Sequence, residues 1–232
     1  LPNRLAASKQ ELEDFRMSLE GDYEFAIVPF SGGASSYYFT PAVSRPAFID
    51  AVRELDSELI FYPGTDLISA FIGLKEMIDG FGFNEDDVNL VILLSDGGKE
   101  ESFAVNRAEL QKAVSQISEL DFKVYSFGVG GLKPTPIVER RDDGVFTAYV
   151  KDEKTGKRQY SVLDEGILKN IAGWGGGRYY RFENSGDLGK NLKSIIEENR
   201  QLKEVRTRYE KTSLRFWFLL SAIIILLMGR GK

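Results

Sequence analysis

The fold of this chain is decided by residues 88–98, VNLVILLSDGG, where an unbroken apolar run ends in a carboxylate and two glycines. Consecutive Val, Ile and Leu residues are typical of a strand in a parallel sheet that is covered on both faces. In open α/β sheets, ligands bind just beyond the carboxyl ends of such strands. Asp96 is therefore placed where binding or chemistry is expected, and the two glycines allow a ligand to approach the backbone.

The segments on either side of this strand alternate between apolar strands and amphipathic helices. The predicted elements lie at residues 23–30, 65–80, 110–120, 123–129, 163–171, 178–182 and 188–202. Such alternation implies right-handed crossovers and an α/β fold with a doubly wound, mostly parallel sheet. Residues 134–160 interrupt the rhythm with short β-like pieces around a polar turn, and they are predicted to form a β-hairpin insertion.

The composition narrows the chemistry that this chain can perform. It has 232 residues with no cysteine and no histidine, which excludes disulfides, zinc sites of the Cys/His type, a cysteine nucleophile and any histidine-based triad. A bound metal must therefore be a hard, oxygen-ligated cation such as magnesium, manganese or calcium. The formal net charge is −5 with both signs interspersed, so no nucleic-acid surface is predicted.

The end of the chain differs in kind from the rest. Residues 216–228, FWFLLSAIIILLM, are uncharged, and basic residues flank them on both sides. With Leu214 and Arg215 the run is about 22 Å long as a helix, shorter than the roughly 30 Å hydrocarbon core of a bilayer. We interpret it as a short membrane span; the alternative is a buried core helix or an interfacial segment. The expected organisation is a domain at 1–212 and a single-pass cell-membrane anchor at 213–232, with unassigned orientation.

Thr65 and Asp96 form the candidate site. Taken singly, Asp96 is a strand-end residue that caps the next turn, and Thr65 is a helix N-cap. Taken together, a hydroxyl at a helix start and a carboxylate at a strand end are predicted to lie at one edge of the sheet, where they can share a cation. The adjacent loops supply the expected binding rim, which consists of Ser31, Gly32, Gly64, Asp66 and Gly97.

These stretches resemble the von Willebrand factor A domain, and more closely its bacterial membrane-anchored aerotolerance (Bat-type) branch. The matching pieces are PNRL at 2–5, AIVPFSGGA at 26–34, GTDL at 64–67, VILLSDGG at 91–98, VYSFGVGG at 124–131, LDEGILKNIAGWGGGRYYR at 163–181 and RFWFLL at 215–220. The resemblance implies a metal-ion-dependent adhesion site made of an Asp-x-Ser-x-Ser segment, a Thr and an Asp. Thr65 and Asp96 match the last two.

The chain departs from this family at its start. The Asp-x-Ser-x-Ser segment and the first strand would lie before Leu1, and this sequence does not contain them. In the strand order 3-2-1-4-5-6, that first strand lies between the strand at 23–30 and the strand at 88–95. We therefore expect a gap or direct pairing between these two strands. We also expect weak binding of magnesium or manganese, and a fragment that does not fold stably alone.

The function implied by the resemblance is a non-enzymatic module that engages a protein partner through a metal and an acidic side chain of that partner. The resemblance also implies assembly with other membrane A-domain proteins and a MoxR-type AAA ATPase, in envelope stress tolerance or complex assembly. The alternative is a metal-dependent hydrolase or phosphotransferase centred on Asp96. Such an enzyme needs further acids near Asp96 and a general base.

Overall fold

The computed structural model divides the chain into two compact units, residues 1–192 and 193–232. The structure describes residues 4–21, 23–32, 39–42, 44–55, 65–84, 87–98, 106–140, 146–151, 155–182, 184 and 186–204. The second unit is described over residues 193–204, which are helical. Within it, the Asn199 side chain donates a hydrogen bond to the Ile195 carbonyl at 2.7 Å, one turn earlier.

The first unit is built on a parallel sheet of three strands in the order β3-β4-β9. These strands are β3 (Asn89–Ser95), β4 (Phe122–Val129) and β9 (Gly176–Phe182). The strand β4 lies in the centre, and its apolar residues are buried almost throughout. The α/β class and the parallel sheet predicted from the apolar strands are thereby confirmed, and the order agrees with the second half of the expected one.

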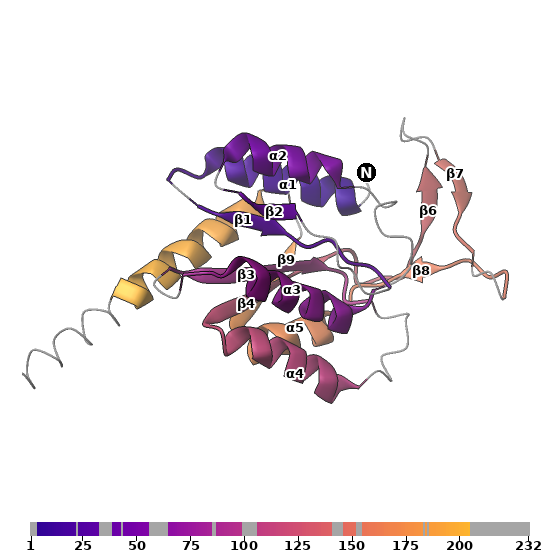
Figure 1. The fold of residues 1–232 in the computed structure, drawn as a ribbon. Coiled ribbons are helices and arrows are strands. Elements are labelled where there is room, and N and C mark those ends of the chain that lie inside the picture. Colours follow the sequence, from indigo (N-terminus) through magenta and orange to yellow (C-terminus); the bar gives the residue numbers. More distant parts are fainter. Residues whose placement is uncertain are drawn as a thin grey trace, which may run out of the picture. The chain divides into compact units, whose positions relative to one another are not determined.

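Three amphipathic helices complete the core on this sheet: α3 (Leu67–Phe81), α4 (Arg107–Ser118) and α5 (Glu165–Trp174). The helices α4 and α5 contact β4, α5 also contacts β9, and α3 packs on α4 (Figure 1). Their apolar stripes supply many of the buried side chains of the core cluster, which include Leu67, Phe71, Leu110, Ile117, Leu168 and Ile171. Burying each such apolar side chain contributes about 1.5–3 kcal/mol, so this packing stabilises the arrangement of the helices and the sheet.

The glycine run after α5 brings β9 against β4. Gly175 ends the helix, and Gly176 has φ +70°. A Cβ atom on Gly175 would collide with the Val124 side chain, and one on Gly177 would collide with the Val124 carbonyl. The run therefore ends a helix and also permits the close approach of two backbones.

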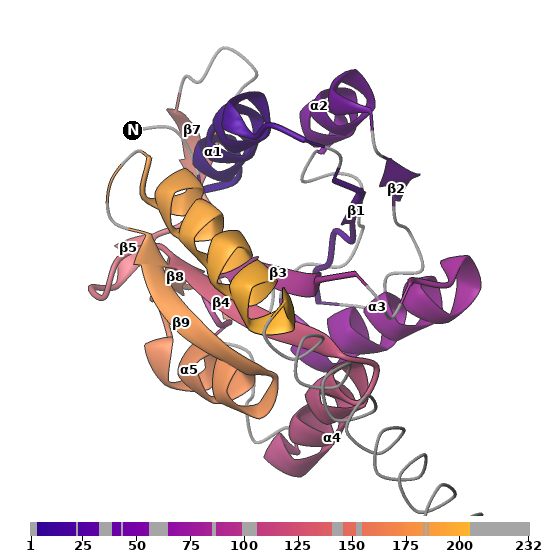
Figure 2. The ribbon, with the colours of Figure 1, turned by 90° about the vertical axis from the view of Figure 1, so that its left-hand side faces the viewer.

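The parallel sheet is smaller than predicted, because the strand at 23–30 does not join it. Its observed part, β1 (Phe25–Ile27), pairs antiparallel with β2 (Phe39–Ala42) in a separate two-stranded sheet. Figure 2 shows this pair apart from β3. The strand β3 is thus an edge strand, and among the described residues the expected gap between it and β1 is present. The strand at 23–30 therefore does not extend the observed parallel sheet, and its antiparallel pairing with β2 was not predicted.

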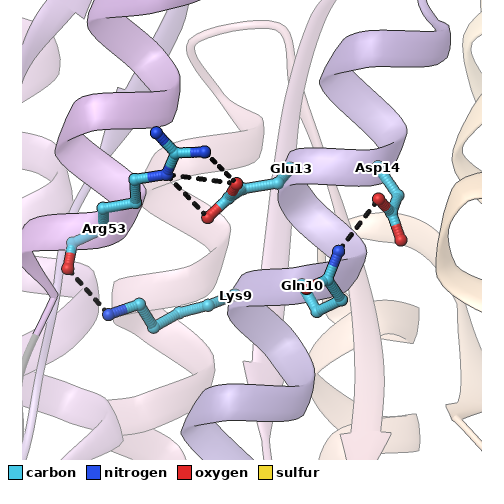
Figure 3. A network of polar contacts seen from close by, with 5 residues as sticks. All are labelled: Lys9, Gln10, Glu13, Asp14 and Arg53. Atoms are coloured by element: carbon cyan, nitrogen blue, oxygen red, sulfur yellow. Dashed lines mark hydrogen bonds and ion pairs between the residues drawn. The ribbon is translucent and has the colours of Figure 1, made fainter.

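Two helices accompany the β1–β2 pair: α1 (Arg4–Ser18) and α2 (Arg45–Glu54). Arg53 forms an ion pair with Glu13 at 2.9 Å, and this carboxylate raises the pKa of the Arg53 guanidinium (Figure 3). Lys9 donates hydrogen bonds to the carbonyls of Arg53 and Leu55, both at 2.8 Å. The Lys9 ammonium at the end of α2 also complements the helix dipole, so this residue of α1 caps the C-terminus of α2.

The stretch between β4 and α5 contains four short antiparallel strands: β5 (Thr135–Pro136), β6 (Val138–Arg140), β7 (Phe146–Tyr149) and β8 (Tyr160–Ser161). The pairs are β5 with β8 and β6 with β7. On β7, Phe146 and Tyr149 are 47% and 37% exposed. The guanidinium of Arg158 lies 4.2 Å from the centre of the Tyr149 ring. We call the segment from Gly131 to Leu163 the insertion; it presents an aromatic surface.

The predicted anchor, residues 213–232, lies outside the described part of the chain. Of the helices that the structure does describe, none combines the length and the apolar character needed to cross a bilayer.

Candidate functional site

Asp96 follows directly after β3, and its carboxylate is held from two sides. The Gly98 N–H donates to Oδ1 at 3.1 Å, and the Ser161 hydroxyl donates to Oδ2 at 2.8 Å. The Asp96 carbonyl accepts a further hydrogen bond from the Asp164 N–H at 2.8 Å. The side chain is half-buried, so its orientation is fixed while part of it stays accessible.

Gly97 and Gly98 are required by both backbone and space. Their φ angles are +81° and +61°, in the left-handed region that glycine favours. A Cβ atom on Gly97 would lie 2.7 Å from the Asp164 carbonyl oxygen, and one on Gly98 would lie 2.7 Å from the Thr65 Cβ and 3.2 Å from its Oγ1. Thr65 thus lies against the glycine whose N–H bonds the Asp96 carboxylate, so both predicted ligands adjoin Gly98.

The helix cap after Thr65 is Asp66. Its carboxylate accepts hydrogen bonds from the Ser69 N–H at 3.0 Å and the Ser69 hydroxyl at 2.6 Å. The alternative role of Thr65 as the N-cap is therefore wrong, because α3 begins one residue later and is capped by Asp66. Capping occupies the Asp66 carboxylate at the helix and leaves the Thr65 side chain beside Gly98.

The rim residues that the structure describes lie in the segments around this turn. The Ser31 carbonyl accepts from the Asp66 N–H at 2.7 Å, which joins the end of the β1 segment to the start of α3. The Ser31 hydroxyl is buried without a hydrogen-bond partner. Gly32 follows it on the surface, Gly97 is buried beside Asp164, and Gly64 lies outside the described residues.

Ser161 is the site residue that sequence reasoning missed. It lies 65 positions after Asp96, at the far end of the insertion, and no spacing motif links the two. The nearby Asp164 caps α5: its carboxylate accepts from the Gly166 and Ile167 N–H groups at 2.9 and 3.3 Å. The Ser161–Asp164 segment therefore caps α5 and is hydrogen-bonded to Asp96.

Glu165, in the first turn of α5, belongs to a separate polar cluster. It bonds Lys169 at 2.8 Å and the Tyr179 hydroxyl at 3.1 Å. The hydrogen bond from Lys169 is the main reason why the pKa of Glu165 is lowered; Tyr179 and Arg181 act in the same direction, and burial opposes them. Among the described residues, no three acidic side chains gather in a way that can hold a metal.

The donor set around Asp96 suits a hard cation. It consists of the Asp96 carboxylate and the Thr65 hydroxyl, with the Ser161 hydroxyl bonded to that carboxylate, and both ligand types supply oxygen. Magnesium and manganese prefer such ligands and retain several waters. A single carboxylate gives little charge compensation, so the residues fit a weak divalent site whose other positions are filled by water or by a partner.

Two solved structures resemble this chain over most of its length. The conserved hypothetical protein BatB of Bacteroides thetaiotaomicron matches at 22% identity and TM-score 0.70, over 86% of this chain and 90% of that one. An aerotolerance-related membrane protein of Bacteroides fragilis matches at 22% identity and TM-score 0.67, over 85% and 90%. No protein-family model and no curated protein matches the sequence. The chain therefore shares its fold with these two bacterial proteins.

Proposed function

We propose that this chain is a membrane-associated, non-enzymatic binding module of the von Willebrand factor A type, with a role in aerotolerance. Two observations support the proposal. The fold is that of BatB and of an aerotolerance-related membrane protein. The sequence pieces GTDL and VILLSDGG that resemble the adhesion site also surround Thr65 and Asp96.

The convergence of Thr65 and Asp96 on Gly98 carries this proposal. A cation held by these two side chains keeps open coordination positions, because two protein oxygens do not fill an octahedron. A carboxylate from a partner protein is the natural further ligand, since it adds the negative charge that the site lacks. The partner therefore binds through one of its acidic side chains.

Binding is favoured over catalysis by what the neighbouring acids do. The carboxylates of Asp66 and Asp164 accept hydrogen bonds from the first turns of α3 and α5. A hydrolase or phosphotransferase centred on Asp96 needs a second acid or base directed at the reacting atoms. With both acids committed to helix caps, Asp96 is better suited to hold a cation than to transfer a proton.

The proposed partners are other membrane A-domain proteins and a MoxR-type AAA ATPase, in the tolerance of envelope stress or the assembly of membrane complexes. The proposed location is the cell membrane, through residues 213–232. The family resemblance of the sequence supports both, and neither follows from the site itself.

Titration calorimetry with Mn²⁺ tests the site. We expect weak binding by the 232-residue chain and stronger binding by a form extended with an Asp-x-Ser-x-Ser strand ahead of Leu1. Asp96→Ala should abolish the gain, whereas Asp79→Ala should not, because Asp79 is an exposed acid that pairs with Lys75 on α3. Tight binding by the short chain that survives Asp96→Ala would place the metal elsewhere and refute the proposal.

A further inference from the structure

The insertion is joined to the candidate site at its base. It leaves β4 at Gly131, whose carbonyl accepts from the Leu163 N–H at 2.9 Å. At its other end, the Ser161 hydroxyl donates to Asp96 Oδ2. The start and the end of the insertion are therefore held together, and the end is also bonded to the residue that follows β3.

Ser161 takes part in two structures at once. Its backbone belongs to the β5–β8 ladder, where Ser161 lies opposite Thr135. Its side chain, in contrast, fixes one oxygen of Asp96 while the Gly98 N–H fixes the other. A hydroxyl that only completes its own loop would bond locally, as that of Thr135 does to the Lys133 carbonyl at 3.2 Å.

The ladder continues outward from Ser161 to the exposed aromatic surface. The Ile137 N–H donates to the Gln159 carbonyl at 2.9 Å, and the Val150 N–H donates to the Ile137 carbonyl at 3.0 Å. Val150 directly follows β7, which carries the exposed Phe146 and Tyr149. A series of hydrogen bonds thus connects the Asp96 carboxylate with the β6–β7 pair.

We propose that Ser161 is a positioning residue that orients the Asp96 carboxylate and couples the insertion to whatever binds there. A cation on Asp96 withdraws charge from the oxygen to which Ser161 donates, so it alters this hydrogen bond and the ladder behind it. This second step rests on the proposed function; the orientation of Asp96 by Ser161 does not.

Amide hydrogen exchange, measured residue by residue by NMR on the full chain without added metal, tests the orientation. Ser161→Ala should speed exchange at Gly98 and Asp164 by about tenfold, because a hydrogen bond to a charged group is lost. Ser161→Thr, which keeps the hydroxyl, should restore the wild-type rates. Thr135→Ala, which removes the hydroxyl opposite Ser161, should leave Gly98 unchanged. If Ser161→Ala accelerates Ile137 but not Gly98, Ser161 serves its own ladder only and the proposal fails.

Adding Mg²⁺ then tests the coupling. In the wild type, Mg²⁺ should change exchange at both Gly98 and Ile137, and in Ser161→Ala at Gly98 alone. An effect confined to Gly98 in the wild type would overturn the coupling. No effect at either residue, at Mg²⁺ concentrations high enough to fill a weak site, would count against the proposed metal function, while the metal-free result decides the orientation separately. The same variants in the form extended by the Asp-x-Ser-x-Ser strand supply the answer if the short chain is too unstable.

Discussion

At the scale of single residues, Gly98 carries the geometry of the site. Replacing it with alanine forces a side chain into the left-handed region and against Thr65. We expect Gly98→Ala to lower the free energy of unfolding by about 1–3 kcal/mol from backbone strain, with a further loss from the clash. Chemical denaturation measures the change.

Gly82 provides the matched control for this substitution. It has φ +66°, close to that of Gly98, but a Cβ atom there would meet nothing within 4 Å. Gly82→Ala should therefore report the backbone strain alone. Equal losses in the two variants would show that Thr65 does not press against Gly98.

The lowered pKa of Glu165 makes the free energy of unfolding depend on pH. Its pKa is lowered in the folded state, chiefly by the hydrogen bond from Lys169, so the ionised form stabilises the fold above the unfolded-state pKa. That contribution is lost as the pH falls through the lower, folded-state pKa. The difference in the free energy of unfolding between wild type and Glu165→Gln should be constant near neutrality and shrink below about pH 4.

Glu109 is the control for helix position, because it lies in the first turn of α4 as Glu165 does in α5. Glu109→Gln removes the favourable charge at a helix start without touching the Lys169 pair. Lys169 is 55% exposed, so the Glu165 effect should also weaken at high salt. A pH-dependent loss of stability of the same size in both variants would assign the effect to the helix dipole instead of the Lys169 pair.

The residues of the site differ in how far sequence could predict them. Asp96, Gly97 and Gly98 were predicted because an apolar strand that stops at a carboxylate is a local pattern. Thr65 was given as the N-cap in place of Asp66, since both residue types cap helices well and the local pattern does not separate them. Ser161 was out of reach, because only the path of the insertion brings it to Asp96.

At the scale of elements, the strands β1 and β3 should be less stable than the central strand β4. Within the described part of the chain, β4 pairs on both sides, whereas β3 pairs with β4 alone and β1 with β2 alone. We expect weak hydrogen-exchange protection at Ala26–Val28 and at Val91–Leu93, and stronger protection at Val124–Phe127. Strong protection of the first two stretches, with cooperative melting, would show that the fold tolerates the lack of a strand between them and that the expected topology is wrong.

Elements with one clear period were predicted well, and their partners were predicted less well. The helix at 65–80 and the strand at 123–129 are observed as α3 and β4, because their apolar spacing fits one structure only. The strand at 23–30 is also apolar throughout, and composition cannot show whether such a strand pairs with β3 or β2. Pairing depends on long-range contacts that a local pattern does not encode.

At the scale of the whole molecule, the testable question is membrane attachment. Residues from about Leu214 onward should direct the chain to the membrane fraction, because they contain the uncharged apolar run 216–228, which basic residues flank. Carbonate extraction of the full chain and of a chain ending before Leu214 measures this. A full chain that stays in the supernatant would favour a core helix, and the shortened chain controls for attachment through residues 1–213.

The edge position of β3 affects how this protein behaves in concentrated solution. Leu90, Val91 and Ile92 are only half-buried, and the strand has no described partner on its outer side. Such an edge is a template for another extended polypeptide, and natural proteins often protect it with lysine or proline. Here the strand offers neither, so concentrated solutions should self-associate edge to edge and eventually precipitate. Leu90→Lys or Ile92→Lys should prevent this association and keep the protein soluble.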